Sequence, residues 1–194
     1  EKIYQKLLKS LTELADDVRE DIISGFELLN YHKIRKKIQS VHHITKSESD
    51  EMIEKLEFER EVQQILGIRS SKKPAASHES DNYDRSLGNI FELIWLTDKF
   101  GEAEIELMNK IRQTKSIPWH DKSILVSALT LSLIRHFDSN KIMLLIDFYE
   151  DGENQVWQRA LVGWITGLYA FDNRLKYYPE ISDRLKSIQG DQSL

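Results

Sequence analysis

Apolar residues recur every three or four positions through the first part of the chain, which is the pattern of a helix with one apolar face. The stripe of the first expected helix consists of Ile3, Leu7, Leu11, Leu14, Val18 and Ile22. Gly25 is expected to end or bend this helix. A second helix is expected from Phe26 to Ile44, and together the two would form an N-terminal helical hairpin.

A third helix is expected to run to about Leu66, where Gly67 is a suitable stop. Ser47 and Asp50 have the spacing of a capping box, so the Ser47 side chain is expected to cap its first turn. The inward positions of this helix are expected to be Met52, Ile53, Leu56, Val62, Ile65 and Leu66.

The character of the sequence changes between residues 69 and 86. From Arg69 to Arg85 the stretch has one aromatic residue, four serines and no aliphatic residue larger than alanine. Such a segment buries too little apolar surface to offset the entropy of ordering the chain. Residues 69–86 are therefore expected to be a flexible linker or a long loop.

The stretch from Ile124 to Ile134 contains no charged residue in eleven positions. A helix that is apolar on every side requires protein on every side, and this one is too short to span a bilayer. We therefore expect it to be the innermost helix of an all-α domain. Its sequence is ILVSALTLSLI.

The region from residue 87 onward is expected to form three helix pairs. The expected helices are Leu87 to Asp98, Glu102 to Gln113, Trp119 to His136, Ser139 to Tyr149, Glu153 to Ala170 and Asn173 to Ile188. The turns repeat, because Phe100, Phe137 and Phe171 are followed by Gly101, Asp138 and Asp172 at spacings of 37 and 34 residues. Asp138 and Asp172 are suited to cap the second helix of their pairs.

At these residues the chain resembles HEAT-like and tetratricopeptide-like helical repeats, over about half of its length. A period in the thirties with two helices per unit is typical of such proteins. The resemblance implies stacked antiparallel helix pairs in an α-solenoid that binds other macromolecules along a concave face. Fold alone does not establish that function.

Composition and charge exclude several function classes. The chain has 194 residues and no cysteine, which excludes disulfides, thiolate metal sites and thiol catalysis. Its formal net charge of −5 argues against binding phosphates over its whole surface. The charged opening EKIYQKLLKS is not a signal peptide, and no apolar run is long enough for a membrane span. A cytoplasmic location is favoured.

No catalytic or metal-binding motif is found in the sequence. His42 and His43 are adjacent, so on a helix they point about 100° apart and cannot share an ion. His120 and His136 lie about 24 Å apart along one expected helix. A nucleophile elbow, a glycine-rich phosphate loop and an HExxH metal motif are all absent. We expect a non-enzymatic protein without cofactor or metal, although a site between helices stays open.

Two local features suggest where partners bind. The expected second helix has a basic face formed by Lys33, Arg35, Lys36 and Lys37, which suits nucleic acid or an acidic protein surface. Among the aromatic residues, Trp119 and Tyr178 are expected to be partly exposed, and exposed aromatic side chains often anchor a partner.

We therefore interpret the chain as a helical-repeat scaffold for protein–protein interaction. Residues 1–68 form the hairpin or a three-helix unit, residues 69–86 the linker, and residues 87–194 three helix-pair repeats. The chain starts at Glu1 within a helical pattern, so we expect it to be part of a longer protein. The alternative is a nucleic-acid-binding repeat protein that uses the face from Lys33 to Lys37. The partner is expected to be a protein of unknown identity, and a homo-oligomer through the first helix remains open.

Overall fold

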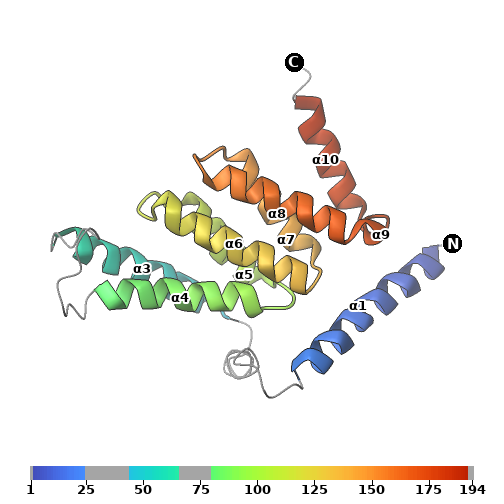
Figure 1. Ribbon diagram of the computed structural model, residues 1–194, viewed down its shortest axis with the longest axis horizontal. Helices are drawn as coiled ribbons and strands as arrows, with labels where there is room; N and C mark the ends of the chain where they lie inside the picture. The colour runs from blue at the N-terminus through green and yellow to red at the C-terminus, as the bar shows by residue number, and fades with distance from the viewer. Residues whose placement is uncertain (1, 25–43, 66–79, 192–194) are drawn as a thin grey trace.

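The computed structural model is all-helical over the residues that it describes, which are 2–24, 44–65 and 80–191 (Figure 1). This confirms the expected all-α class. The helices are α1 (Lys2–Ser24), α3 (Lys46–Ile65), α4 (Ser80–Leu96), α5 (Glu102–Gln113), α6 (Trp119–Arg135), α7 (Ser139–Glu150), α8 (Val156–Ala170), α9 (Asp172–Leu175) and α10 (Pro179–Asp191).

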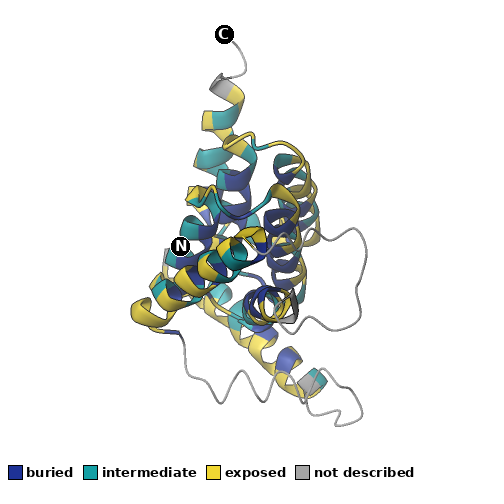
Figure 2. Ribbon diagram, turned by 90° about the vertical axis from the view of Figure 1, so that its left-hand side faces the viewer, coloured by how far each residue is buried: buried dark blue, intermediate teal, exposed yellow. Residues whose placement is uncertain are grey.

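The helices that follow α1 are arranged in two rows. In one row, α6 packs against α4 on one side and against α8 on the other (Figure 1). In the other row, α5 packs between α3 and α7, and α7 also contacts α10. Residues that face neighbouring helices are buried, whereas those on the outer sides are exposed (Figure 2). The rows therefore enclose a continuous apolar core.

Helix α6 lies at the centre of this core, as its sequence predicts. Leu125, Leu129 and Leu133 are completely buried between the two rows. The expectation that every side of α6 is covered is wrong, however, because one face remains open in the described structure. That face presents Ile124, Leu131 and Ile134, which are 40–47% exposed.

Helix α8 approaches α6 and α7 closely through two glycines spaced four residues apart. A methyl group on Gly163 would collide with the Thr130 side chain, and one on Gly167 would collide with Leu133. Since residues four apart lie on one helical face, the two glycines form a smooth strip against α6. This strip explains why α8 can lie so near its neighbours.

The turns that the sequence aligns do contact one another. The Phe100 amide donates to Asp138 Oδ2 at 2.8 Å, and the amide of Asn140 donates to the same carboxylate at 3.0 Å. Asp138 thus caps α7, as expected, and also joins it to the preceding turn. Asp172 does not cap a helix, because it is the first residue of α9 and the cap position is Phe171.

Helix α3 begins with a capping box two residues earlier than expected. Thr45 donates its amide to Glu48 Oε2 at 2.6 Å, and the Glu48 amide donates to Thr45 Oγ1 at 3.3 Å. The expected pair of Ser47 and Asp50 was therefore wrong, because Ser47 already lies inside the helix. Ile65, expected to face inward, is 82% exposed at the last residue of α3.

Helix α4 begins at Ser80, within the stretch expected to be a linker. Tyr83 and Leu87 are buried there, and the Tyr83 hydroxyl donates to Asp121 Oδ2 at 2.6 Å. Tyr83 thus connects the first turns of α4 to α6, a contact that the low apolar content of the segment does not indicate. The linker prediction is wrong for residues 80–86.

The last expected helix, Asn173 to Ile188, is divided into α9 and α10. Pro179 is the first residue of α10, where a missing amide hydrogen costs nothing. Inside a longer helix its ring would clash with the preceding turn. The expected second helix, Phe26 to Ile44, lies outside the described residues except for Ile44, which is buried and not helical.

Candidate interaction surface

Helix α1 carries four carboxylates on one face. Glu13, Asp16, Asp17 and Glu20 are spaced by three, one and three residues, so their side chains project from the same side of the helix. Asp16 and Glu20 are buried although they are acidic, which indicates that this face is covered by protein. Helix α1 therefore docks through its polar side.

Basic side chains and one hydroxyl from the rest of the protein bind this acidic face. The Tyr178 hydroxyl donates to Glu13 at 2.9 Å, and Arg174 donates to Asp16 at 2.7 Å. His136 Nε2 lies 3.0 Å from Asp17 Oδ1, and Lys99 pairs with the same residue at 3.4 Å. Arg135 donates to Glu20 at 2.9 Å.

The partners of α1 come from segments far apart in the sequence. Lys99 lies in the link between α4 and α5, Arg135 ends α6 and His136 follows it. Arg174 belongs to α9, and Tyr178 immediately precedes α10. The docking site for α1 therefore forms only when these segments, between Lys99 and Tyr178, are folded together.

The electrostatics of the docked face favour the charged form of Asp17. Partial burial would raise the pKa of Asp17, but the hydrogen bond from His136 and the charge of Lys99 outweigh it and lower that pKa. The Arg174 pKa is raised, chiefly by its hydrogen bond to Asp16. Burial, together with the hydrogen bond to Glu13, raises the pKa of the Tyr178 hydroxyl. At neutral pH, α1 is therefore held by ion pairs and by a protonated phenol.

The opposite face of α1 is apolar and open. The seven large apolar residues of this face are 49–76% exposed, although a helix stripe of this kind normally faces a core. Contiguous exposed apolar surface of this extent is typical of an interaction site. We call these residues the α1 stripe: Ile3, Tyr4, Leu7, Leu11, Leu14, Val18 and Ile22.

The two aromatic residues singled out in the sequence lie in different places. Trp119 is 44% exposed at the start of α6. Tyr178 is only 5% exposed, so its expected exposure was wrong. Its ring packs 4.8 Å from that of Phe137, just beyond the other end of α6, while its hydroxyl binds Glu13. Trp119 and Tyr178 therefore do not share a site.

The basic face expected to bind nucleic acid or an acidic protein surface belongs to the expected second helix. Lys33, Arg35, Lys36 and Lys37 lie outside the described residues. The acidic face of α1, in contrast, was missed by the sequence reasoning. The sequence does contain the pattern. Glu13, Asp16, Asp17 and Glu20 recur at helical spacing on the side of the helix opposite to the apolar stripe.

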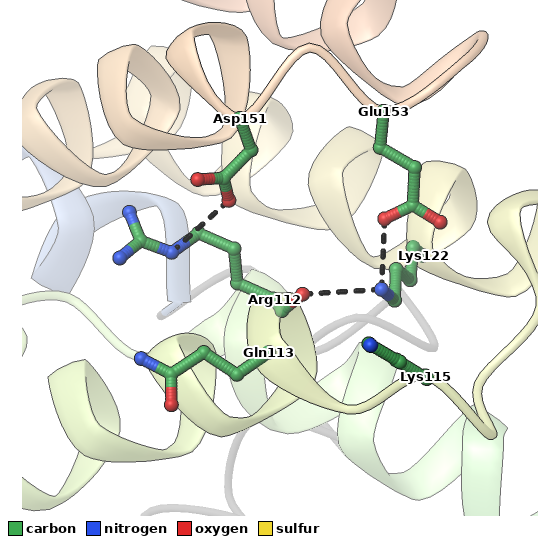
Figure 3. Close-up of a pocket in the computed structure, with 6 residues that line it drawn as sticks. All are labelled: Arg112, Gln113, Lys115, Lys122, Asp151 and Glu153. Atoms are coloured by element: carbon green, nitrogen blue, oxygen red, sulfur yellow. Dashed lines mark hydrogen bonds and ion pairs between the residues drawn. The ribbon is translucent and has the colours of Figure 1, made fainter.

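An open depression near the α7–α8 turn contains a separate ionic cluster (Figure 3). Lys122 donates to Glu153 at 2.8 Å and to the Arg112 carbonyl at 3.1 Å, and the Arg112 guanidinium lies 3.2 Å from Asp151. Burial raises the pKa of Asp151. Since these charges compensate one another across helix ends, the cluster ties α5, α6 and the α7–α8 turn together.

Neither a metal site nor a membrane span is found within residues 2–24, 44–65 and 80–191. No three His, Asp or Glu side chains gather there as ligands for an ion, and no helix in those ranges is long and apolar enough to cross a bilayer. The α1 stripe is thus the strongest candidate functional surface of the described chain. Comparisons with protein-family models, with curated proteins and with solved structures find no match.

Proposed function

We propose that the protein is a non-enzymatic helical-repeat scaffold that binds another protein chain through the α1 stripe. The observation that carries this proposal is the orientation of α1, whose acidic face is held by Arg135, Arg174 and Tyr178. Because these contacts fix the helix, its apolar side is directed outward. A rigidly presented apolar helix face suits helix-in-groove or helix–helix recognition.

The arrangement of the helices supports the scaffold part of the proposal. Successive helix pairs lie in two rows, and the contact between Phe100 and Asp138 links one turn to the next. Such an array forms an extended support that can hold α1 in one fixed position. The ionic cluster around Lys122 supports a structural role as well, because its charges are directed at one another.

Capture of tagged protein from a lysate tests the proposal directly. The double variant Leu7→Glu/Leu14→Glu places two charges in the α1 stripe, and we expect it to lose a partner that the wild-type chain retains. The matched control is Leu131→Glu/Ile134→Glu, which places two charges on the exposed face of α6. Equal retention by both double variants would contradict the proposal.

A nuclease treatment and a high-salt wash separate this function from nucleic-acid binding. Contacts to phosphates weaken steeply with salt, whereas an apolar interface does not. A partner that survives both treatments supports the α1 stripe. Trp119→Ala separately tests the partner-binding role that the sequence suggested for this half-exposed side chain at the start of α6.

A further inference from the structure

We infer that the part of the helical array that holds the acidic face of α1 is a receptor site for an acidic helix of another protein, and that α1 occupies it as a competitor within the same chain. We call this part the α1 docking site: Lys99, Arg135, His136, Arg174 and Tyr178. It binds the side of α1 opposite to the α1 stripe. A helix that displaces α1 would therefore also release the α1 stripe from its outward position.

Helix α1 is attached to the array by polar contacts. Between Ile3 and Ile23 its only buried residues are Asp16 and Glu20, and its apolar side chains are exposed except for Leu8 and Ile23, which are partly buried. Helices α3 to α8, in contrast, all bury apolar side chains in the common core. Helix α1 lies beside the two rows rather than within them (Figure 1). Its departure would therefore expose little apolar surface, and an incoming acidic helix would replace the lost hydrogen bonds.

The α1 docking site keeps its shape through contacts within the array. Two guanidinium nitrogens of Arg135 donate to the carbonyl oxygen of Trp95, at 3.2 and 3.1 Å. The guanidinium of Arg174 and the ring of Tyr178 both lie against Phe137, at 5.5 and 4.8 Å from its ring centroid. Since none of these contacts involves α1, the side chains stay oriented when α1 leaves. Such preorganisation lowers the cost of binding a new ligand.

The spacing of the bound residues describes the ligand that fits this site. The carboxylates that it binds occupy positions i, i+3, i+4 and i+7 on one helix face, at Glu13, Asp16, Asp17 and Glu20. One turn earlier, the Lys9 amine lies 4.0 Å from the centroid of the Tyr178 ring. A competing helix should therefore carry a lysine followed by carboxylates 4, 7, 8 and 11 positions later.

The α1 docking site suits a protein helix better than nucleic acid. The contact with the Tyr178 ring calls for a cation on the ligand, which a nucleic acid lacks. Arg135 already binds the carboxylate of Asp98, and the formal net charge of the chain is −5. Both features weaken the attraction of a polyanion, whereas a helix with separate charges of both signs can match the site group by group.

Fluorescence anisotropy of a labelled peptide tests this exchange on the full chain. The probe is a synthetic peptide of the α1 sequence that carries Leu7→Ala, Leu11→Ala and Leu14→Ala, so it keeps the acidic face and loses the centre of the α1 stripe. The receptor is the variant Asp16→Asn/Glu20→Gln, whose own α1 competes less. Because occupied sites reduce the apparent affinity, we expect this variant to bind the probe at least about ten-fold more tightly than the wild type.

Two matched controls isolate the role of the carboxylates. The receptor control is Glu51→Gln/Glu54→Gln, which removes two exposed carboxylates from α3 and should bind the probe no more tightly than the wild type. The probe control carries Asp16→Asn and Glu20→Gln itself and should not bind. Equal affinities of the wild type and Asp16→Asn/Glu20→Gln, or equal binding of the two probes, would overturn the inference. Since neither probe has the three leucines of the α1 stripe, this result is independent of the proposed function.

Hydrogen exchange in the wild-type chain tests the displacement without any substitution in the receptor. With saturating probe, the α1 amides should lose protection, whereas the amides of α6 and α7 should keep theirs. Unchanged protection of α1 would mean that the probe does not take its place, and the inference would be wrong. An oligouridylate that releases α1 as well as the probe does, at the same salt concentration, would overturn the assignment to a protein helix.

Discussion

Arg135 of α6 and Glu20 of α1 form an ion pair at 2.9 Å, although 115 residues separate them in the sequence. Glu20 is almost completely buried, and Arg135 also binds the carboxylate of Asp98 and the carbonyl oxygen of Trp95. One guanidinium thus joins α1 to the end of α4. Because the pair is shielded from water, losing the Arg135 guanidinium weakens the compensation of a buried charge.

Removing Arg135 is expected to release α1. Arg135→Ala leaves Glu20 and Asp98 without their shared cation, which should reduce the free energy of unfolding by about 3–5 kcal/mol. Urea denaturation measures the loss, and hydrogen exchange of the α1 amides shows whether this helix opens first. Lys99→Ala is the control, since its pair with Asp17 is half-exposed and should contribute less than about 1 kcal/mol.

The docking of α1 should weaken in acid through Asp17. Its pKa in the folded protein lies below the ordinary value of 3.8, because His136 and Lys99 favour the carboxylate. The stabilisation is therefore complete above the unfolded pKa and is lost as the pH falls through the lower folded pKa. Hydrogen exchange of α1 across this range measures the loss.

The matched variant for this prediction is Asp17→Asn, which keeps the shape and removes the charge. It should lower the protection of α1 at neutral pH and show a smaller change on acidification. An identical acid dependence in wild type and variant would show that the charge of Asp17 does not control the docking of α1.

Much of the helical array could be predicted from local sequence patterns. The bounds of Glu102–Gln113 were predicted to the residue, and Asp138 was recognised as the cap of α7. Such features depend on neighbouring residues, so a local pattern determines them. Tyr83 shows the limit, because its burial depends on Asp121, which lies 38 residues away and accepts its hydrogen bond.

The candidate site was only half visible in the sequence. The apolar residues of α1 were recognised, but an apolar stripe is normally directed inward. In this protein the stripe faces outward because the acidic face of α1 binds the helical array. One of the residues that bind this face, Arg174, lies 158 residues after its partner Asp16. No periodicity links residues at such separations. The same contact with α1 explains why Tyr178 is buried rather than exposed.

Close packing of α8 should be sensitive to a single methyl group. Gly163→Ala would drive a Cβ atom into Thr130 and Leu145, and we expect a loss of about 1–3 kcal/mol in the free energy of unfolding. Gly88→Ala is the matched control, because nothing lies within 4 Å of the added atom in α4. There the better helix propensity of alanine should stabilise the protein by about 0.5–1 kcal/mol. Thermal unfolding of both variants decides the prediction, which is wrong if they shift in the same direction.

Lys141 should make the stability of the array depend on pH in the alkaline range. Its side chain is fully buried, and its amine donates to the carbonyl oxygens of Thr97 at 3.0 Å and Asp98 at 2.6 Å, just beyond the end of α4. Burial lowers the pKa of Lys141 from 10.5 to about 7. Between these values the unfolded chain keeps a proton that the folded chain has lost.

The free energy of unfolding should therefore rise with pH, by about 1 kcal/mol per unit between pH 7 and about 9. Above that range Tyr83 and Tyr178 add an opposite slope, because burial raises the pKa of each hydroxyl above its ordinary 10.0. Lys141→Met removes the titrating group and also its hydrogen bonds to the carbonyl oxygens of Thr97, Asp98 and His136, so it should lower stability by about 1–3 kcal/mol and flatten the slope. Urea denaturation at a series of pH values separates the two effects. Only the loss of the titrating proton changes the slope of the free energy of unfolding against pH. If the slope is the same in wild type and variant, Lys141 remains charged in the folded protein and its carbonyl partners outweigh its burial.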